Sequence, residues 1–239
     1  MITGEIAMHR KLHFLLALTS LQIVLVSVNR LSGLTLSYVA PNEFLRWIDL
    51  LNMVLGFVSV LVYFLLARHL VDVSDRPRTS AHRALDVVFV VGAYLYASSY
   101  GSHEVTNYLH ERFCWTSTTD LCRIIGYNDD GFSHYLFFAG FIVLNLVVML
   151  TQAVSPDDRP SSALDNVLVV VNALFISTGI VANLGFEVIG LDLYVVAAVA
   201  VLAVVLLRRH PRQLVLRYYA VAYVVGLVAT VAIKSIMGT

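Results

Sequence analysis

Seven long apolar stretches divide the chain, and short polar segments separate them. A helix needs about 20 mostly apolar residues to cross roughly 30 Å of hydrocarbon. The pattern therefore predicts an all-α membrane bundle of seven helices in a single domain over residues 1–239. The expected spans are 12–28, 47–67, 84–103, 132–154, 164–184, 188–207 and 214–233. The first span lacks a small-residue cleavage site, so we interpret it as a retained helix rather than a signal peptide.

Composition narrows the class of protein. Hydrophobic residues make up 59% of the chain and charged residues 13%, whereas about a quarter of an average soluble domain is charged. An ordinary soluble enzyme and a disordered chain are therefore excluded. The 16 basic and 16 acidic residues balance, so the chain has no basic excess for binding nucleic acid. We expect an integral membrane protein that contacts membrane lipid, in the plasma membrane of a prokaryote.

The basic residues predict an orientation, because cytoplasmic loops carry an excess of Lys and Arg. One set of ends and loops holds 11 of them and the other holds 5. We therefore expect a cytoplasmic N-terminus and an external C-terminus. The richer set is Arg10, Lys11, Arg68, Arg76, Arg78, Arg83, Arg159, Arg208, Arg209, Arg212 and Arg217, and the poorer set is Arg30, Arg46, Arg112, Arg123 and Lys234.

Two cytoplasmic turns resemble each other and suggest an internal helix-hairpin repeat. One contains Asp75-Arg76-Pro77 and the other Asp158-Arg159-Pro160, and an apolar helix follows each. The period is about 80 residues, and repeats of this kind are common in membrane folds. The alternative is that cytoplasmic turns independently favour Asp, Arg and Pro, through helix starts and the positive-inside rule.

Polar side chains gather at the outer end of the third span, where they are informative because polar groups are costly in a membrane. With 3.6 residues per turn, four of these polar side chains lie on one face of the helix and three lie on the adjacent face. The first face carries Ser99, His103, Asn107 and His110, and the second carries Glu104, Tyr108 and Glu111.

The fourth span begins at the same outer end with Asp129, Asp130 and His134. These residues therefore converge with those of the third span on one layer. In the repeat alignment, Asn183 and Glu187 of the fifth span fall opposite His103 and Asn107, and would complete an outer cavity with Asn107 and Asp129.

Imidazole and carboxylate groups together are the ligands that zinc and iron take in proteins. We expect His103, His110 and His134 to hold a divalent metal, zinc or iron. Glu104 or Asp130 would then act as a general base, as would Asp129, and Ser98 or Ser99 would orient the substrate. The alternatives are a solvated helix end without chemistry, and a haem held between His103 and His134.

The two cysteines, Cys114 and Cys122, lie in the predicted outer loop. Disulfides persist outside the cytoplasm, so we expect these two to be bonded and to pin the loop over the polar layer.

Three short motifs occur in a suggestive order: Asp49-x-x-Asn52, Ser99-x-x-x-His103 and Asp130 before the fourth span. This order resembles the CREST superfamily of seven-helix membrane metal hydrolases, which includes the alkaline ceramidases and progestin-receptor-like proteins. The resemblance implies Ser99 as an oxyanion or water-orienting group, His103 as a zinc ligand, Asp130 as acid/base partner, and hydrolysis of an amide in a lipid. The family's His-x-x-x-His pair is absent, since the last span contains no histidine.

Two functions compete at this stage. The first is a metal-dependent enzyme that hydrolyses a lipid or isoprenoid at the outer interface, with Ser99, Glu104 and Asp130 as catalytic groups. The alternative is a transporter or binding protein with an outward-opening cavity lined by Asn183, Glu187 and Asp192. Transporters place substrate groups near the membrane midplane. The midspan polar residues here are uncharged, which favours an interfacial site; they are Asn145, Asn172, Ser177 and Thr178. A structural or assembly subunit remains a third interpretation.

Overall fold

The computed structural model describes residues 2–184 and 191–237, and within these ranges the chain is helical without a strand. Seven helices are long and apolar enough to cross a membrane, as the sequence predicts. The elements are α1 (Ile2–Leu31), α2 (Trp47–Val73), α3 (Ser80–Leu109), the π-helix η1 (His110–Cys114), α4 (Asp120–Gly126), the π-helix η2 (Tyr127–Phe132), α5 (Ser133–Val154), α6 (Ala163–Leu184), α7 (Leu191–Arg209) and α8 (Leu214–Met237).

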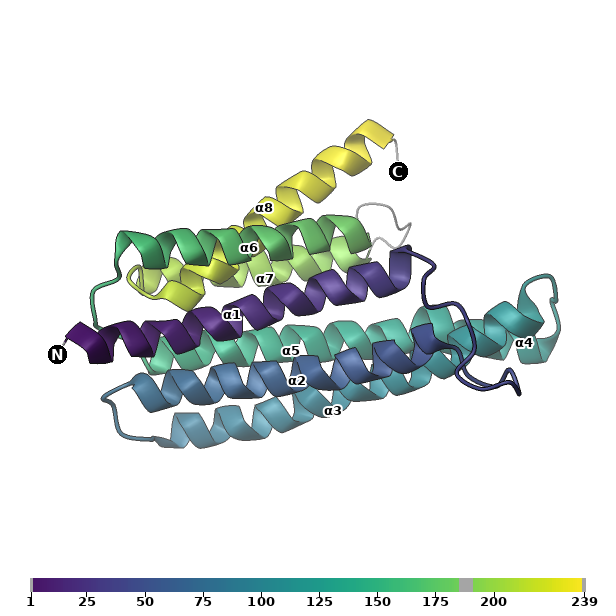
Figure 1. Ribbon diagram of the computed structural model, residues 1–239, viewed down its shortest axis with the longest axis horizontal. Helices are drawn as coiled ribbons and strands as arrows, with labels where there is room; N and C mark the ends of the chain where they lie inside the picture. Colours follow the sequence, from purple (N-terminus) through teal and green to yellow (C-terminus); the bar gives the residue numbers. More distant parts are fainter. Residues whose placement is uncertain (1, 185–190, 238–239) are drawn as a thin grey trace.

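The helices run roughly along one long axis, and the second half of α8 diverges from the others (Figure 1). Helix α3 packs mainly on α5, and α8 packs on α6 and α7, while α1 lies against α2 and α6. We call one end the arginine end, because the turns there carry Arg76, Arg159 and Arg212. We call the other the histidine end, because it carries His103 and His110.

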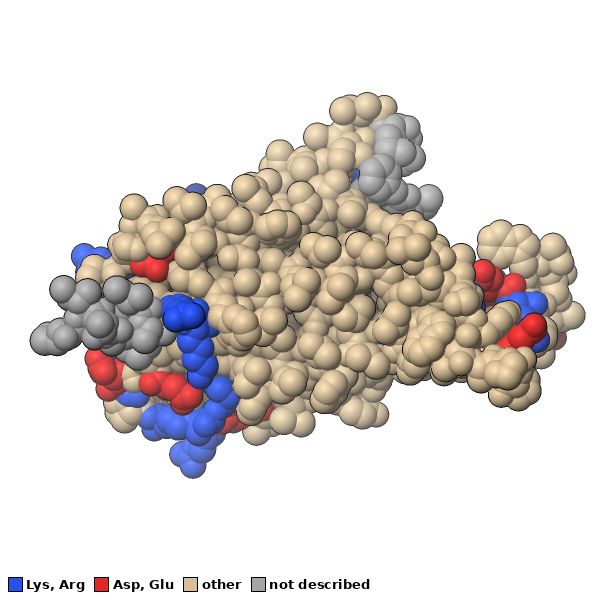
Figure 2. Space-filling model, in the orientation of Figure 1, with Lys and Arg blue, Asp and Glu red and all other residues tan. Residues whose placement is uncertain are grey.

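The surface between the two ends is apolar. Figure 2 shows charged side chains toward the two ends of the visible face and a broad uncharged middle. Large hydrophobic side chains such as Phe57, Val90, Tyr94 and Val201 are exposed there. An exposed apolar surface of this extent is typical of a multi-pass membrane protein, because lipid rather than water surrounds these side chains.

The third and fourth membrane helices extend further than the apolar pattern predicts. Helix α3 and η1 continue unbroken to Cys114 rather than ending at residue 103, and the next helical segment starts at Asp120 rather than at residue 132. Hydropathy shows which residues are suited to the hydrocarbon of a membrane. A helix can extend beyond these residues for as long as its backbone hydrogen bonds continue. The result is a helical hairpin that projects beyond the bundle at the histidine end (Figure 1).

Helices α3 and α5 approach closely because Gly140 has no side chain. A Cβ at Gly140 would lie 2.4 Å from the backbone nitrogen of Tyr96. Toward the arginine end, the interior is instead filled by fully buried leucines, among them Leu16, Leu66 and Leu216. These leucines close the bundle interior at that end. The internal repeat and the membrane orientation stay predictions.

Candidate functional site

Asp129 lies at the centre of the polar layer at the histidine end. Its side chain is 1% exposed, and its two oxygens contact two imidazoles: Oδ1 is 2.9 Å from Nδ1 of His103, and Oδ2 is 3.2 Å from Nδ1 of His110. The carboxylate comes from η2, whereas the histidines come from α3 and η1. The wide turns of π-helices often occur at functional sites, and here two of them bring His110 and Asp129 together.

This arrangement selects the tautomer of His110. An ionised carboxylate only accepts hydrogen bonds, so Nδ1 of His110 donates to Asp129 and its Nε2 keeps its lone pair. Nδ1 of His103 lies within ion-pair distance of Oδ1 of Asp129, but without the geometry of a hydrogen bond. Among the described residues, no hydrogen bond occupies Nε2 of His103 or His110. A carboxylate that fixes an imidazole through Nδ1 and leaves Nε2 available is the usual second-shell partner of a metal ligand or a general base.

The three histidines predicted as metal ligands divide between two sides of Asp129. The rings of His103 and His134 contact each other, with centroids 5.2 Å apart, and both line an internal cavity. In the part of the chain that the structure describes, the group with ligand atoms within 4.8 Å of one another is His110, Asp129 and Asp130. The sequence thus predicted the members of this layer, whereas the grouping around Asp129 emerges only from the fold.

Glu104 is a second buried carboxylate, 4% exposed, on the cavity wall. Nδ2 of Asn52 donates to its Oε2 at 3.0 Å, and Nδ2 of Asn29 donates to Oδ1 of Asn52 at 2.7 Å. Thr35 donates to Oδ1 of Asn29 at 2.7 Å. This chain of amides holds Glu104 in place, and connects α1, α2 and α3.

Arg46 was not predicted as a site residue from the sequence, yet it connects several polar side chains at the histidine end. It is buried before α2, donates from Nε and Nη2 to the two oxygens of Asp49, both at 2.8 Å, and donates from Nη1 to Glu111. Burial alone lowers the pKa of Arg46, but the bonds to Asp49 and Glu111 outweigh it, and its pKa lies above the usual value. A cation at a helix N-terminus is unfavourable because it opposes the helix dipole. The position of Arg46 just before α2 therefore indicates, in the sequence itself, that carboxylates must lie nearby.

Asn107 is a further partner of Arg46. Nη2 of Arg46 donates to Oδ1 of Asn107 at 3.1 Å, and Asn107 and Asp129 are not among the described residues that line the cavity. The other predicted cavity residues, the side chain of Asn183 and all of Glu187, lie outside the described residues. Ser99 does line the cavity and donates to the carbonyl of Tyr96 at 2.8 Å, while Asp130 is exposed.

The cavity has a volume of about 240 Å³ and a mainly apolar wall. His103, Glu104 and His134 lie at its polar end, and Tyr63 and Tyr218 lie deep inside the bundle. Asp192, predicted for the transporter interpretation, is buried and lines it too. From Asn52, which contacts Glu104, to Tyr63 is 11 residues of α2, or about 16 Å at 1.5 Å per residue. The cavity is therefore a deep pocket with its histidines and charged groups at one end.

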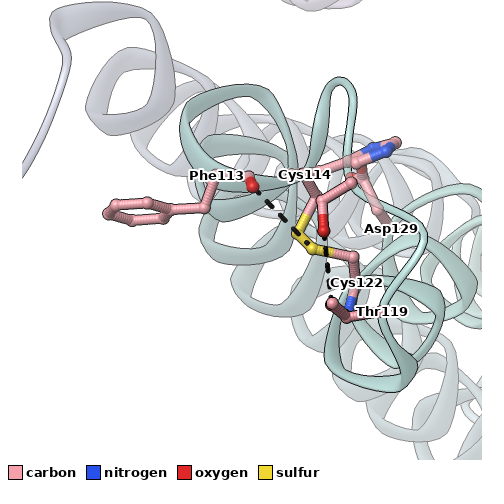
Figure 3. The surroundings of a disulfide bond; sticks show 7 residues. Phe113, Cys114, Thr119, Cys122 and Asp129 are labelled. Atoms are coloured by element: carbon pink, nitrogen blue, oxygen red, sulfur yellow. Dashed lines mark hydrogen bonds and ion pairs between the residues drawn. A yellow bond between two sulfur atoms is a disulfide. The ribbon is translucent and has the colours of Figure 1, made fainter.

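Cys114 and Cys122 form the predicted disulfide. Figure 3 shows the bond with Asp129 among its surroundings, and the hydroxyl of Thr119 accepts from the backbone nitrogen of Cys122 at 3.4 Å. Cys114 ends the π-helix that begins with His110, and Cys122 lies in the helix that leads to Asp129. The disulfide therefore joins the two segments that carry the imidazole and its carboxylate.

The fold and the site together define a helical membrane bundle with a His–Asp–His cluster around a buried aspartate, beside a deep apolar cavity. No protein-family model matches this chain, and neither a curated protein nor a solved structure matches it.

Proposed function

We propose that this protein is a membrane-embedded, metal-dependent hydrolase that acts on a lipid-like substrate at the histidine end, which would face the outside of a prokaryotic plasma membrane. The observation that carries the proposal is Asp129, buried between His103 and His110. A buried charge with two imidazole partners is costly to maintain, and buried carboxylate–imidazole groups beside a cavity are typical of catalytic sites.

His110, Asp129 and Asp130 would hold the divalent metal, zinc or iron. One imidazole nitrogen and two carboxylates match the donor set of both ions, and the three residues offer ligand atoms within 4.8 Å of one another. When bound, such an ion lowers the pKa of a coordinated water to about 7 and polarises a carbonyl.

His103 would move the proton. Its Nδ1 lies 2.9 Å from Oδ1 of Asp129, and its ring lines the cavity. Nε2 can then accept a proton from the attacking water, and Asp129 stabilises the imidazolium that forms. Glu104, also on the cavity wall, would protonate the leaving group. The apolar wall beyond these residues would take the hydrocarbon part of the substrate. The same reaction class is implied by the resemblance to the CREST superfamily.

Metal content and turnover, measured together, test this assignment. Detergent-purified wild type, prepared without chelator, is compared with His110→Ala, His103→Ala and the arginine-end control His210→Ala by elemental mass spectrometry. Release of fatty acid from amide-linked and ester-linked lipids is followed by liquid chromatography and mass spectrometry.

We expect about one zinc or iron per chain in wild type and His210→Ala. His110→Ala should lose both metal and turnover, whereas His103→Ala should keep the metal and lose turnover. Wild-type protein that hydrolyses lipid without any bound metal would contradict the metal assignment. Turnover unchanged in His103→Ala would contradict its role as a base.

A transporter or binding protein is the second candidate, favoured by the depth of the cavity. At mid-depth the hydroxyls of Tyr63 and Tyr223 donate to Oδ1 of Asn145, at 3.1 and 3.2 Å. These three residues form an uncharged polar cluster inside the cavity. Proteoliposomes that accumulate a lipid analogue without altering it chemically would favour this function over hydrolysis.

A further inference from the structure

Five aromatic side chains form a continuous wall along the cavity. Consecutive ring centroids lie 5.3, 5.8, 6.2 and 5.8 Å apart, and two of the four contacts are stacked. In this order the wall consists of Tyr96, Phe137, Phe141, Tyr223 and Tyr219, all of which line the cavity. We call this set the aromatic wall.

The hydroxyls of Tyr96 and Tyr223, two of the three tyrosines of the wall, are already engaged by the protein. Tyr223 donates to Asn145 at 3.2 Å, and the hydroxyls of Tyr96 and Tyr100 are 3.4 Å apart. Because these polar groups have partners, the wall presents ring surface to an occupant. A ring surface favours π systems, since aromatic groups gain energy from stacked and edge contacts beyond the burial of area.

The shape of the cavity favours a single chain rather than a bulky group. It runs from Glu104 at the polar end to Tyr63 in the interior, and buried leucines including Leu16 and Leu216 close the bundle beyond it. Only the polar end offers imidazoles and carboxylates to a head group, and these include His103 and Glu104. An occupant is therefore an amphiphile with its hydrocarbon chain along the aromatic wall.

We propose that the cavity binds the unsaturated chain of an isoprenoid, with the polar group of the ligand at His103 and Glu104. The sp² carbons spaced along such a chain contact successive rings of the wall, and a saturated chain of the same shape lacks these π contacts. The proposal rests on the proposed function for the reaction at the polar group. Recognition of the chain does not require that reaction, so the two are tested separately.

The test compares farnesol with fully hydrogenated farnesol, which share carbon skeleton, branching and head group and differ only in the double bonds. Wild-type protein in lipid nanodiscs is loaded with tritiated farnesol, and each unlabelled alcohol displaces it. We expect farnesol to displace the label at a concentration at least tenfold lower than the hydrogenated alcohol. Equal displacement by both, or no saturable binding of farnesol, would overturn the proposal.

Phe141→Leu tests whether the wall causes the selectivity, because leucine keeps an apolar side chain and removes the ring. We expect its selectivity ratio to fall to threefold or less. The matched control is Phe175→Leu, which removes an exposed ring of α6 and should keep the wild-type ratio. A wild-type ratio in Phe141→Leu, in protein that elutes as wild type on gel filtration, would contradict the assignment.

Chelator treatment separates this proposal from the proposed function. Selectivity for farnesol that persists in chelator-treated protein supports chain recognition, even if no hydrolysis is found in any assay. Hydrolysis that depends on metal but shows no preference between unsaturated and saturated chains overturns the isoprenoid proposal, and leaves the hydrolase standing.

Discussion

Asp129 shows how a single residue organises the candidate site. Its carboxylate receives one imidazole on each oxygen, and the hydroxyl of Ser133 donates to its backbone carbonyl. Burial of an unpaired carboxylate would be prohibitive, whereas a carboxylate with an imidazole against each oxygen and a hydrogen bond from His110 can be maintained. Both histidines therefore lie against the same side chain.

Asp129→Asn should reduce turnover at least about a hundredfold, since loss of an orienting carboxylate permits the wrong imidazole tautomer. An amide offers one oxygen acceptor and one NH₂ donor, so it cannot present an acceptor oxygen to both Nδ1 atoms. Lipid hydrolysis rates measure the effect, and Asp120→Asn, an exposed residue of the projecting hairpin, is the isosteric control. Wild-type turnover in Asp129→Asn would remove Asp129 from the mechanism.

At this scale the sequence revealed which residues belong to the layer, but not how they pair. Helical periodicity placed His103 and His110 on one face and brought Asp129 to the same level. It could not distinguish Asp129 from Asp130, because the π-turn that buries one and exposes the other has no local sequence signature. The sequence did not reveal the role of Arg46, because its partners Asn107 and Glu111 lie more than 60 residues away in the chain.

Among the elements, the contact of α3 with α5 positions His103 against His134 and depends on Gly140. Gly140→Ala would place a methyl 2.4 Å from the Tyr96 backbone nitrogen, and backbone cannot move aside as a flexible side chain can. We expect a loss of several kcal/mol in unfolding free energy, at the upper end of overpacking effects. Thermal unfolding in detergent measures it.

Gly101→Ala on α3 is the control for that substitution, because a Cβ there meets no atom within 4 Å. It should leave stability unchanged or raise it by up to about 1 kcal/mol, since alanine loses less backbone entropy than glycine in a helix. Equal melting temperatures for the two variants would contradict the close approach of α3 and α5.

The turn between α5 and α6 gives a pH-dependent prediction. Burial alone raises the pKa of Asp157, but hydrogen bonds and charge from Arg159 outweigh it, and the pKa lies below its usual value. A lowered folded-state pKa stabilises the fold above the unfolded pKa of about 3.9, and the contribution disappears as pH falls through the folded value. Asp157→Asn should therefore cost about 1.5–3 kcal/mol at pH 7, typical of charged hydrogen bonds.

The difference in stability between wild type and Asp157→Asn should shrink as pH falls below about 4, where the unfolded aspartate is protonated. Chemical unfolding at a series of pH values measures it. Asp158→Asn changes the exposed neighbour and should match wild type throughout. A difference that stays constant down to pH 2 would show that the carboxylate charge contributes nothing.

The number of membrane helices followed from the sequence, whereas the projecting hairpin did not. Apolar runs mark the part of a helix that lies in hydrocarbon, and the seven runs each became a helix. Residues 104–131 are polar enough to resemble a loop, yet their helical segments are joined by the disulfide between Cys114 and Cys122. The site lies at the base of that hairpin, which is why its geometry could not be derived from hydropathy.

The molecule as a whole has two unlike ends. The cavity has its imidazoles and carboxylates at the histidine end, whereas buried leucines close the arginine end. The disulfide lies at the histidine end, and a structural disulfide persists only in an oxidising compartment. The excess of Lys and Arg at the other end predicts that this end lies in the cytoplasm. The disulfide and the basic residues therefore predict the same orientation, with the candidate site facing outward.

Cysteine labelling in intact cells tests this orientation, because the native cysteines are both oxidised and do not react with maleimide. Asn42→Cys introduces an exposed thiol at the histidine end and Asp158→Cys an exposed thiol at the arginine end. A membrane-impermeant maleimide should label Asn42→Cys in intact cells and should label Asp158→Cys only after the membrane is permeabilised. The reverse pattern would place the His–Asp–His cluster in the cytoplasm, where the substrate would have to come from the inner leaflet.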